Sequence, residues 1–202
     1  MSSPSLDSEA ELLRRLRSGD ERAFVLLVGR YHDSMLRVAM SFVPSRAVAE
    51  EVVQDTWLAA LRGLSGFEGR SSLRTWLFRI LVNRARTTGT REHRSIPIAD
   101  AGPVVDASRF GPDGAWIAPP EQWIEEAESR LAAGKLAELL HAALDDLPSR
   151  QREVVTLRDV EGMSSGEACE VLGISEANQR VLLHRGRGKL RQVLEAELRE
   201  GR

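Results

Sequence analysis

The stretch that decides the fold is "MSSGEACEVLGISEANQRVLL", residues 163–183. Ser164 stands three residues before Glu167, which is the spacing of a capping box at the start of a helix. Gly173 supplies a tight turn after that helix, and Ser175 can cap a second one. The stretch therefore predicts two short helices joined by a tight turn, which is a helix-turn-helix.

The second of these helices carries side chains suited to reading DNA. Asn and Gln can pair bidentately with adenine in the major groove, and Arg can pair with guanine. A helix N-terminus also favours phosphate. Ile174 is expected to fill the core between the two helices. The first turns of the second helix present Asn178, Gln179, Arg180, His184 and Arg185.

Charge is strongly segregated along a chain whose net charge is only −2. Residues 62–94 carry +6, residues 95–146 carry −7, and residues 179–191 carry +5. Basic blocks at helical spacing indicate a polyanionic partner, whereas the alternative is an ordinary solvated helix face. A solvated face would intersperse acids four residues from its arginines, and residues 179–191 contain no acid.

Upstream, apolar residues recur every three or four positions, which predicts four helices within about the first 85 residues. Gly19 and Pro44 are expected to end the first two helices. Ser45 can begin the third, and Ser71 or Ser72 the fourth. These helices predict a compact bundle.

Residues 95–130 are rich in proline and glycine and predict an acidic linker. Trp116 and Trp123 within it indicate docking onto another surface. Helices resume at about residue 131 and pause before Pro148. The expected fold class is all-α, with an N-terminal helical bundle and a C-terminal helix-turn-helix domain joined by this linker.

Composition excludes several classes. No apolar run approaches the roughly 18 residues of a membrane span, and the first residues lack the layout of a secretory leader. Cys169 is the single cysteine, so an internal disulfide is impossible, which fits a reducing compartment, the cytoplasm. Its thiol is expected to act as a small buried hydrophobe, with a redox sensor as the alternative.

Catalytic patterns do not stand out. The chain has no GxSxG, HExxH or phosphate-loop motif and no cysteine–histidine cluster. His32, His93 and His141 are scattered without ligand spacing. We therefore expect a protein that is not an enzyme and that needs no cofactor and no metal.

Two long segments carry a family resemblance. They are "AEEVVQDTWLAALRGLSGFEGRSSLRTWLFRILVNRAR", residues 49–86, and "LDDLPSRQREVVTLRDVEGMSSGEACEVLGIS", residues 144–175. In this order they resemble the bacterial RNA polymerase sigma factors of the small, two-domain, extracytoplasmic-function type within the sigma-70 family. The resemblance covers about residues 20–95 and 136–198.

The resemblance implies a transcription initiation factor that directs core RNA polymerase to promoters. Residues 1–94 would form a sigma region 2-like domain that binds core polymerase and recognises and melts the −10 element. Residues 95–130 would be the linker, lying in a basic polymerase channel as a nucleic-acid mimic. Residues 131–202 would form a sigma region 4-like domain that recognises the −35 element.

The same resemblance implies site residues. In the −10 pocket, Phe67 would stack on a flipped base and Asn83 would read its edge, whereas Trp76 and Leu77 are expected in the core. Gln179 stands where an apolar side chain often packs inward. The polymerase-binding set is Glu51, Gln54, Asp55 and Leu58; the −10 set is Phe67, Arg70, Arg79, Asn83, Arg84 and Arg86; the −35 set is Asn178, Gln179, Arg180, Val181, His184 and Arg185.

The implied partners are core RNA polymerase, through its clamp coiled coil and flap, promoter DNA and an anti-sigma factor, with no membrane insertion. An alternative is a stand-alone helix-turn-helix regulator that binds operators as a dimer without polymerase. That alternative leaves Phe67 and Asn83 unexplained.

Overall fold

The computed structural model describes residues 9–92 and 133–200. The chain divides into two units between Ser95 and Ile96, and helices are the only regular elements in the described parts. The all-α prediction, with two small helical domains, is thus confirmed. The predicted linker, with Trp116 and Trp123, lies outside the described residues. None of the described helices is both long and apolar enough to cross a bilayer.

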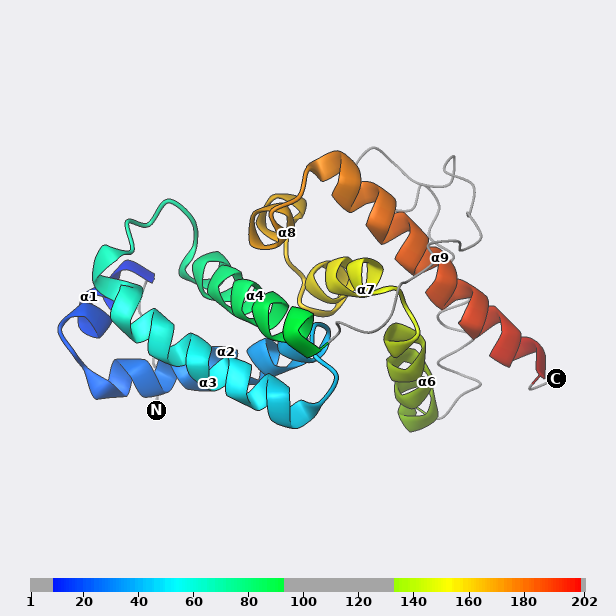
Figure 1. Ribbon diagram of the computed structural model, residues 1–202, viewed down its shortest axis with the longest axis horizontal. Coiled ribbons are helices and arrows are strands. Elements are labelled where there is room, and N and C mark those ends of the chain that lie inside the picture. The colour runs from blue at the N-terminus through cyan, green and yellow to red at the C-terminus, as the bar shows by residue number, and fades with distance from the viewer. Residues whose placement is uncertain (1–8, 93–132, 201–202) are drawn as a thin grey trace, which may run out of the picture. The chain divides into compact units, whose positions relative to one another are not determined.

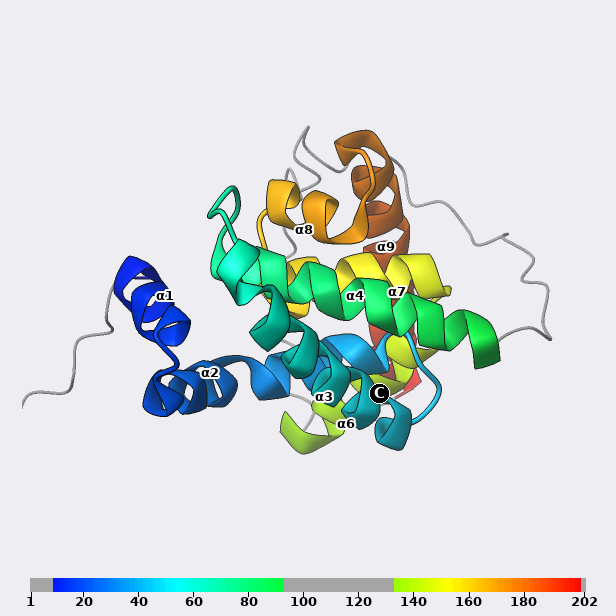
Figure 2. The same ribbon diagram turned by 60° about the vertical axis from the view of Figure 1, so that its left-hand side comes forward.

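The first unit packs three long helices side by side, and a short helix lies against one end of this group (Figures 1 and 2). Its elements are α1 (Glu9–Arg17), α2 (Glu21–Met40), α3 (Arg46–Gly63), a short 3-10 turn (Leu64–Gly66) and α4 (Leu73–Glu92).

Local capping explains where these helices begin. The Asp20 carboxylate accepts from the backbone N–H of Arg22 at 2.9 Å and of Ala23 at 3.3 Å, and a hydrogen bond from Arg15 is the main cause that lowers its pKa. Ser45 caps α3 as predicted. Ser72, one of the two predicted caps of α4, accepts from the Thr75 N–H at 3.1 Å.

Burial of one face of each long helix holds this unit together. Met35, Val53 and Leu77 are fully enclosed, and each such side chain contributes about 1.5–3 kcal/mol by leaving water. Edge-on ring contacts add specificity between helices. Phe24 of α2 meets Trp57 of α3 with ring centroids 5.8 Å apart.

A glycine permits the last turns of α4 to approach the end of α2. A Cβ at Gly89 would lie 2.7 Å from the carbonyl oxygen of Phe42, well inside normal contact distance. Because the obstructing atom belongs to the backbone, a larger side chain cannot be accommodated by a rotamer change.

The second unit is built around one long helix. α9 (Glu176–Glu200) packs against α6 (Ala133–Asp145), α7 (Ser149–Val155) and α8 (Ser165–Leu172). A single π-helical turn (Thr156–Val160) extends α7.

The predicted helix-turn-helix is present between α8 and α9 (Figure 1). Ser164 and Glu167 form both bonds of the capping box. Gly173 adopts the left-handed conformation, with φ +65°, that ends α8 and that a side chain disfavours. The Ser175 hydroxyl accepts from the Asn178 N–H at 3.3 Å and caps α9. Ile174, expected in the core, is only half-buried.

The thiol of Cys169 lies on α8 with intermediate exposure. Burial is the main cause that raises its pKa, and the nearby Glu176 carboxylate adds to the rise. A thiol with a raised pKa is mostly protonated at neutral pH and is a poor nucleophile. This favours the expectation of a small hydrophobe over that of a redox sensor.

Substitution of Gly89 by alanine should lower the free energy of unfolding by about 1–3 kcal/mol, because the added methyl group collides with the backbone of Phe42. Gly29 is the matched control, since it lies in α2 with open space around it, and alanine there should raise stability by up to about 1 kcal/mol. Urea denaturation followed by circular dichroism measures both. Equal effects of the two substitutions would contradict the close approach.

Ellman's reagent should label Cys169 more slowly in the folded chain than in the urea-unfolded chain at neutral pH. The folded pKa lies above the ordinary value of 9.0. Burial of the neutral thiol therefore stabilises the fold fully below pH 9.0, and this contribution is lost as the pH rises through the raised pKa. Rapid labelling of the folded chain at neutral pH would show that the thiol is a reactive one.

Candidate protein and nucleic-acid interfaces

The four residues predicted to bind polymerase form one exposed stripe on α3. Glu51, Gln54, Asp55 and Leu58 follow one another at intervals of three, one and three residues, which places them on the same helix face. All four are exposed, and Leu58 keeps 51% of its surface accessible. A carboxylate-bearing face that ends in an exposed leucine suits docking to a basic helical partner.

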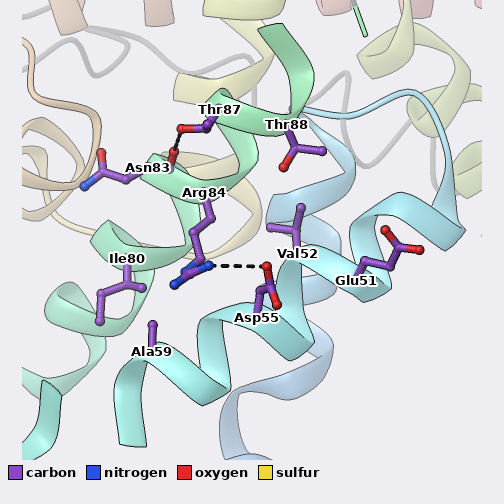
Figure 3. A pocket seen from close by; sticks show the side chains of 9 residues that line it. All are labelled: Glu51, Val52, Asp55, Ala59, Ile80, Asn83, Arg84, Thr87 and Thr88. Atoms are coloured by element: carbon purple, nitrogen blue, oxygen red, sulfur yellow. Dashed lines mark hydrogen bonds and ion pairs between the residues drawn. The ribbon is translucent and has the colours of Figure 1, made fainter. Parts of the chain in front are cut away.

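A groove of about 500 Å³ runs between this stripe and α4. The Arg84 guanidinium reaches across it from α4 to the Asp55 carboxylate, 3.3 Å away (Figure 3). The ion pair is exposed to solvent, so it contributes at most about 1 kcal/mol. The structure thereby brings together one residue predicted for polymerase and one predicted for −10 DNA.

Asn83 is exposed on α4 and lines the same groove. Its side chain points away from the Asp55–Arg84 pair (Figure 3). Arg79 precedes it by four residues, and Arg86 follows it by three, so the three share one face of α4. Arg86 is half-buried, with its guanidinium 5.7 Å from the centre of the Phe42 ring, where it stabilises the unit itself.

Phe67, predicted to stack on a flipped base, does not present its ring to solvent in this structure. Its side chain keeps only 5% exposure and packs against Trp76, with ring centroids 5.0 Å apart. Its carbonyl oxygen accepts a hydrogen bond from Arg17. Phe67 and Asn83 also line different hollows, so the structure does not bring them into one pocket.

The loop around Phe67 contains a further exposed cation. Arg70 projects into solvent and pairs with Glu68 at 2.7 Å. Trp76, predicted in the core, is only half-buried and packs on both Phe67 and Gly63. Leu77, predicted there too, is fully buried.

In the helix-turn-helix, Asn178 and Val181 are exposed on the first turns of α9. Val181 keeps 48% of its surface accessible. Arg180, His184 and Arg185 are partly exposed. These five side chains remain candidates for contact with DNA.

Gln179, by contrast, is not exposed on the surface of α9. Its side chain is completely buried, and its amide oxygen accepts a hydrogen bond from the Ser165 hydroxyl at 3.2 Å. Leu183, four residues later on the same face, is buried as well. The prediction that Gln179 contacts DNA is therefore corrected, because this face of α9 is the one that packs against the rest of the unit.

Two of the basic residues of α9 form ion pairs within their own unit. Arg187 holds Asp159 in a two-bond fork of 2.9 and 2.6 Å, and Arg191 pairs with Glu195. Both acidic partners lie outside the basic stretch 179–191, since Asp159 comes from the π-helical turn and Glu195 from the next turn of α9. The net positive charge offered to a partner is consequently smaller than the sequence indicated.

Comparison with known proteins agrees with this division into two units. Residues 27–95 match the family described as Sigma-70 region 2. Residues 137–190 match the family described as Sigma-70, region 4.

Similar proteins cover nearly the whole chain. The RNA polymerase sigma-H factor of Pseudomonas aeruginosa is 30% identical over 194 residues, which are 96% of this chain and 97% of that protein. The ECF (extracytoplasmic-function) RNA polymerase sigma-E factor of Escherichia coli is 31% identical over 176 residues, 87% of this chain and 88% of its own length.

Solved structures share the fold. CnrH, in complex with the cytosolic domain of CnrY, has a TM-score of 0.62 at 29% identity, over 94% of this chain and 99% of CnrH. The sigma factor RpoE of Bartonella quintana, in complex with the anti-sigma factor NepR, has a TM-score of 0.54 at 22% identity, over 85% of this chain and 96% of RpoE. The chain belongs to the sigma-70 family of bacterial RNA polymerase sigma factors, in its extracytoplasmic-function group.

Proposed function

We propose that the two units of this chain recognise different parts of a promoter, the first unit the −10 element and the second unit the −35 element. As a sigma factor of the extracytoplasmic-function group, it is a transcription initiation factor that binds core RNA polymerase and directs it to promoters. The observation that carries this function is the presence of region 2 and region 4 in one chain and in that order. Sigma factors are not enzymes, and we propose no catalysis.

The first unit would bind polymerase through the stripe of Glu51, Gln54, Asp55 and Leu58. Its exposed carboxylates and the exposed leucine at its end support docking to a clamp coiled coil of opposite charge. The residues up to 94 would form this domain.

The same unit would open the −10 element with residues of α4 and of the loop before it. Asn83, exposed on α4, has an amide suited to the edge of an unpaired base. Arg79 and Arg84 on the same helix, and Arg70 in the loop before it, would hold phosphates of the opened strand. The proposal rests on these residues rather than on Phe67, whose ring is enclosed.

The second unit, from about residue 131 onward, would read the −35 element in the major groove. Asn178 and Val181 present their side chains outward from the start of α9. An amide can pair with adenine, and an apolar side chain can contact the methyl group of thymine. Arg180, His184 and Arg185 would add contacts to bases and phosphates.

Residues 95–130 would join the two units and lie in a basic channel of the polymerase, since these residues carry a net charge of −5. An anti-sigma factor is a further proposed partner, because RpoE was solved with the anti-sigma factor NepR and CnrH with the cytosolic domain of another protein, CnrY. We place the protein in the cytoplasm, where polymerase and promoters are found.

Run-off transcription on fragmented genomic DNA tests the function. Core RNA polymerase with the purified full-length chain should start at a small set of shared sequences, and core polymerase alone should not. Mapping of the 5′ ends identifies the starts. If the chain instead binds specific sites without polymerase and produces no new starts, it is a stand-alone regulator.

Leu58→Ala should weaken binding to core polymerase about tenfold, because the exposed leucine at the end of the stripe would be buried against the partner and its apolar area would be lost. Leu26→Ala is the control, since Leu26 is a similarly exposed leucine, at 59%, on α2. Fluorescence anisotropy of the labelled chain measures both affinities. Equal affinities of the two variants would remove the α3 stripe from the interface.

A further inference from the structure

A hydrogen-bonded pair of polar side chains lies between the two helices of the helix-turn-helix. Gln179 is among the largest side chains that are completely buried in the described residues. The Ser165 hydroxyl on α8 donates to its amide oxygen at 3.2 Å. Buried polar groups in proteins are normally hydrogen-bonded throughout, so each half of this amide has to be accounted for.

The other half of the amide is not paired. The Nε2 atom of Gln179 is buried without a hydrogen-bond partner among the described residues. Leu183, one turn after Gln179 on α9, and Ala168, one turn after Ser165 on α8, are fully buried apolar residues. A half-satisfied buried amide is less stabilising than an apolar side chain of the same shape. Stability alone is therefore a poor explanation for glutamine at this position.

The bond is placed where it can fix the angle between the helices. Ser165 begins α8, about 10 Å along the axis from Leu172 at the turn. Gln179 lies three residues into α9, about 4.5 Å from its start. A contact between two arms at a distance from their corner constrains their angle more tightly than a contact at the corner does.

The angle between α8 and α9 affects the side chains that flank Gln179. Asn178 precedes it and is exposed, and Val181 follows two positions later on the outer face. These side chains emerge from the same turn of α9 whose opposite face Gln179 anchors. A rotation or tilt of that turn moves them directly, whereas the rest of α9 is held separately by Arg187 and Asp159.

We propose that Gln179 is a positioning residue for promoter recognition. Its bond to Ser165 sets the angle at which the first turn of α9 presents Asn178 and Val181 to the −35 element. This inference rests on the proposed function of the second unit as the −35 reader.

The experiment uses full-length chain bound to core polymerase and a duplex library with a randomised ten-base-pair segment upstream of a fixed −10 region. Selection with the wild-type chain identifies the preferred −35 sequence, and dissociation constants are then measured for that duplex. Gln179→Met keeps the shape and removes the bond. Ser165→Ala removes the donor to Gln179 together with the hydrogen bond between Ser165 and the Cys169 thiol, and Ser165→Thr retains the hydroxyl. Neither Ser165 variant touches the cap of α8, which is Ser164.

Gln179→Met should raise the melting temperature, because the unpaired amide is gone, yet weaken binding to the selected duplex by up to about tenfold, as a mismatched base pair does. Ser165→Ala should weaken binding similarly, and Ser165→Thr should restore it. Gln192→Met, at an exposed position on the same helix, should change neither quantity. A purely structural role would move stability and affinity together.

Wild-type affinity and base preference in both Gln179→Met and Ser165→Ala would overturn the inference. If Gln179→Met does not fold, the comparison of Ser165→Ala with Ser165→Thr decides the question. A separate outcome concerns the selection itself, in which the wild-type chain enriches no −35 sequence from the library at all. That result would refute the proposed function of the second unit, and this inference with it.

Discussion

The close approach of α9 to α7 is the constraint on which the architecture of the second unit depends. A Cβ at Gly186 would lie 2.6 Å from a methyl carbon of Val155, so the helices approach this closely because α9 has no side chain at that position. Gln179, Leu183 and Gly186 are four and three residues apart and form the buried face. The rotation of α9 about its axis is thereby fixed, and Asn178 and Val181 are turned outward as a consequence.

This rotation also decides what the charges of α9 do. Arg187 lies where it can form its fork with Asp159 of the π-helical turn, and that ion pair ties the middle of α9 to the segment that follows α7. The charge of Arg187 is largely neutralised by Asp159, so it stabilises the packing of α9 and contributes little to the affinity for DNA. The basic character of residues 179–191 therefore has two separate origins, one structural and one available for a polyanion.

Local features of the sequence predicted the helices well because their causes are local. The capping box at Ser164 and the left-handed turn at Gly173 depend on residues within one or two turns, so spacing alone located them. The misplaced site residues share a different cause. Phe67 is enclosed by Trp76, and Gln179 is turned inward by the packing of α9. Such contacts join segments that are distant in the sequence and meet only in the folded chain. For Phe67 the sequence did offer one sign of burial, because it is an apolar residue in a short loop close to Leu64.

The ion pair between Asp55 and Arg84 has a consequence for how the first unit can be dissected. It joins the stripe proposed for polymerase to the face proposed for −10 DNA across one groove. Any substitution at Asp55 also alters the surroundings of Arg84, so a loss of activity there could not be assigned to one partner. Leu58 lies three residues further along α3 and carries no charge. A substitution at Leu58 therefore leaves the Asp55–Arg84 pair intact, and it alters the stripe proposed for polymerase without altering the face proposed for −10 DNA.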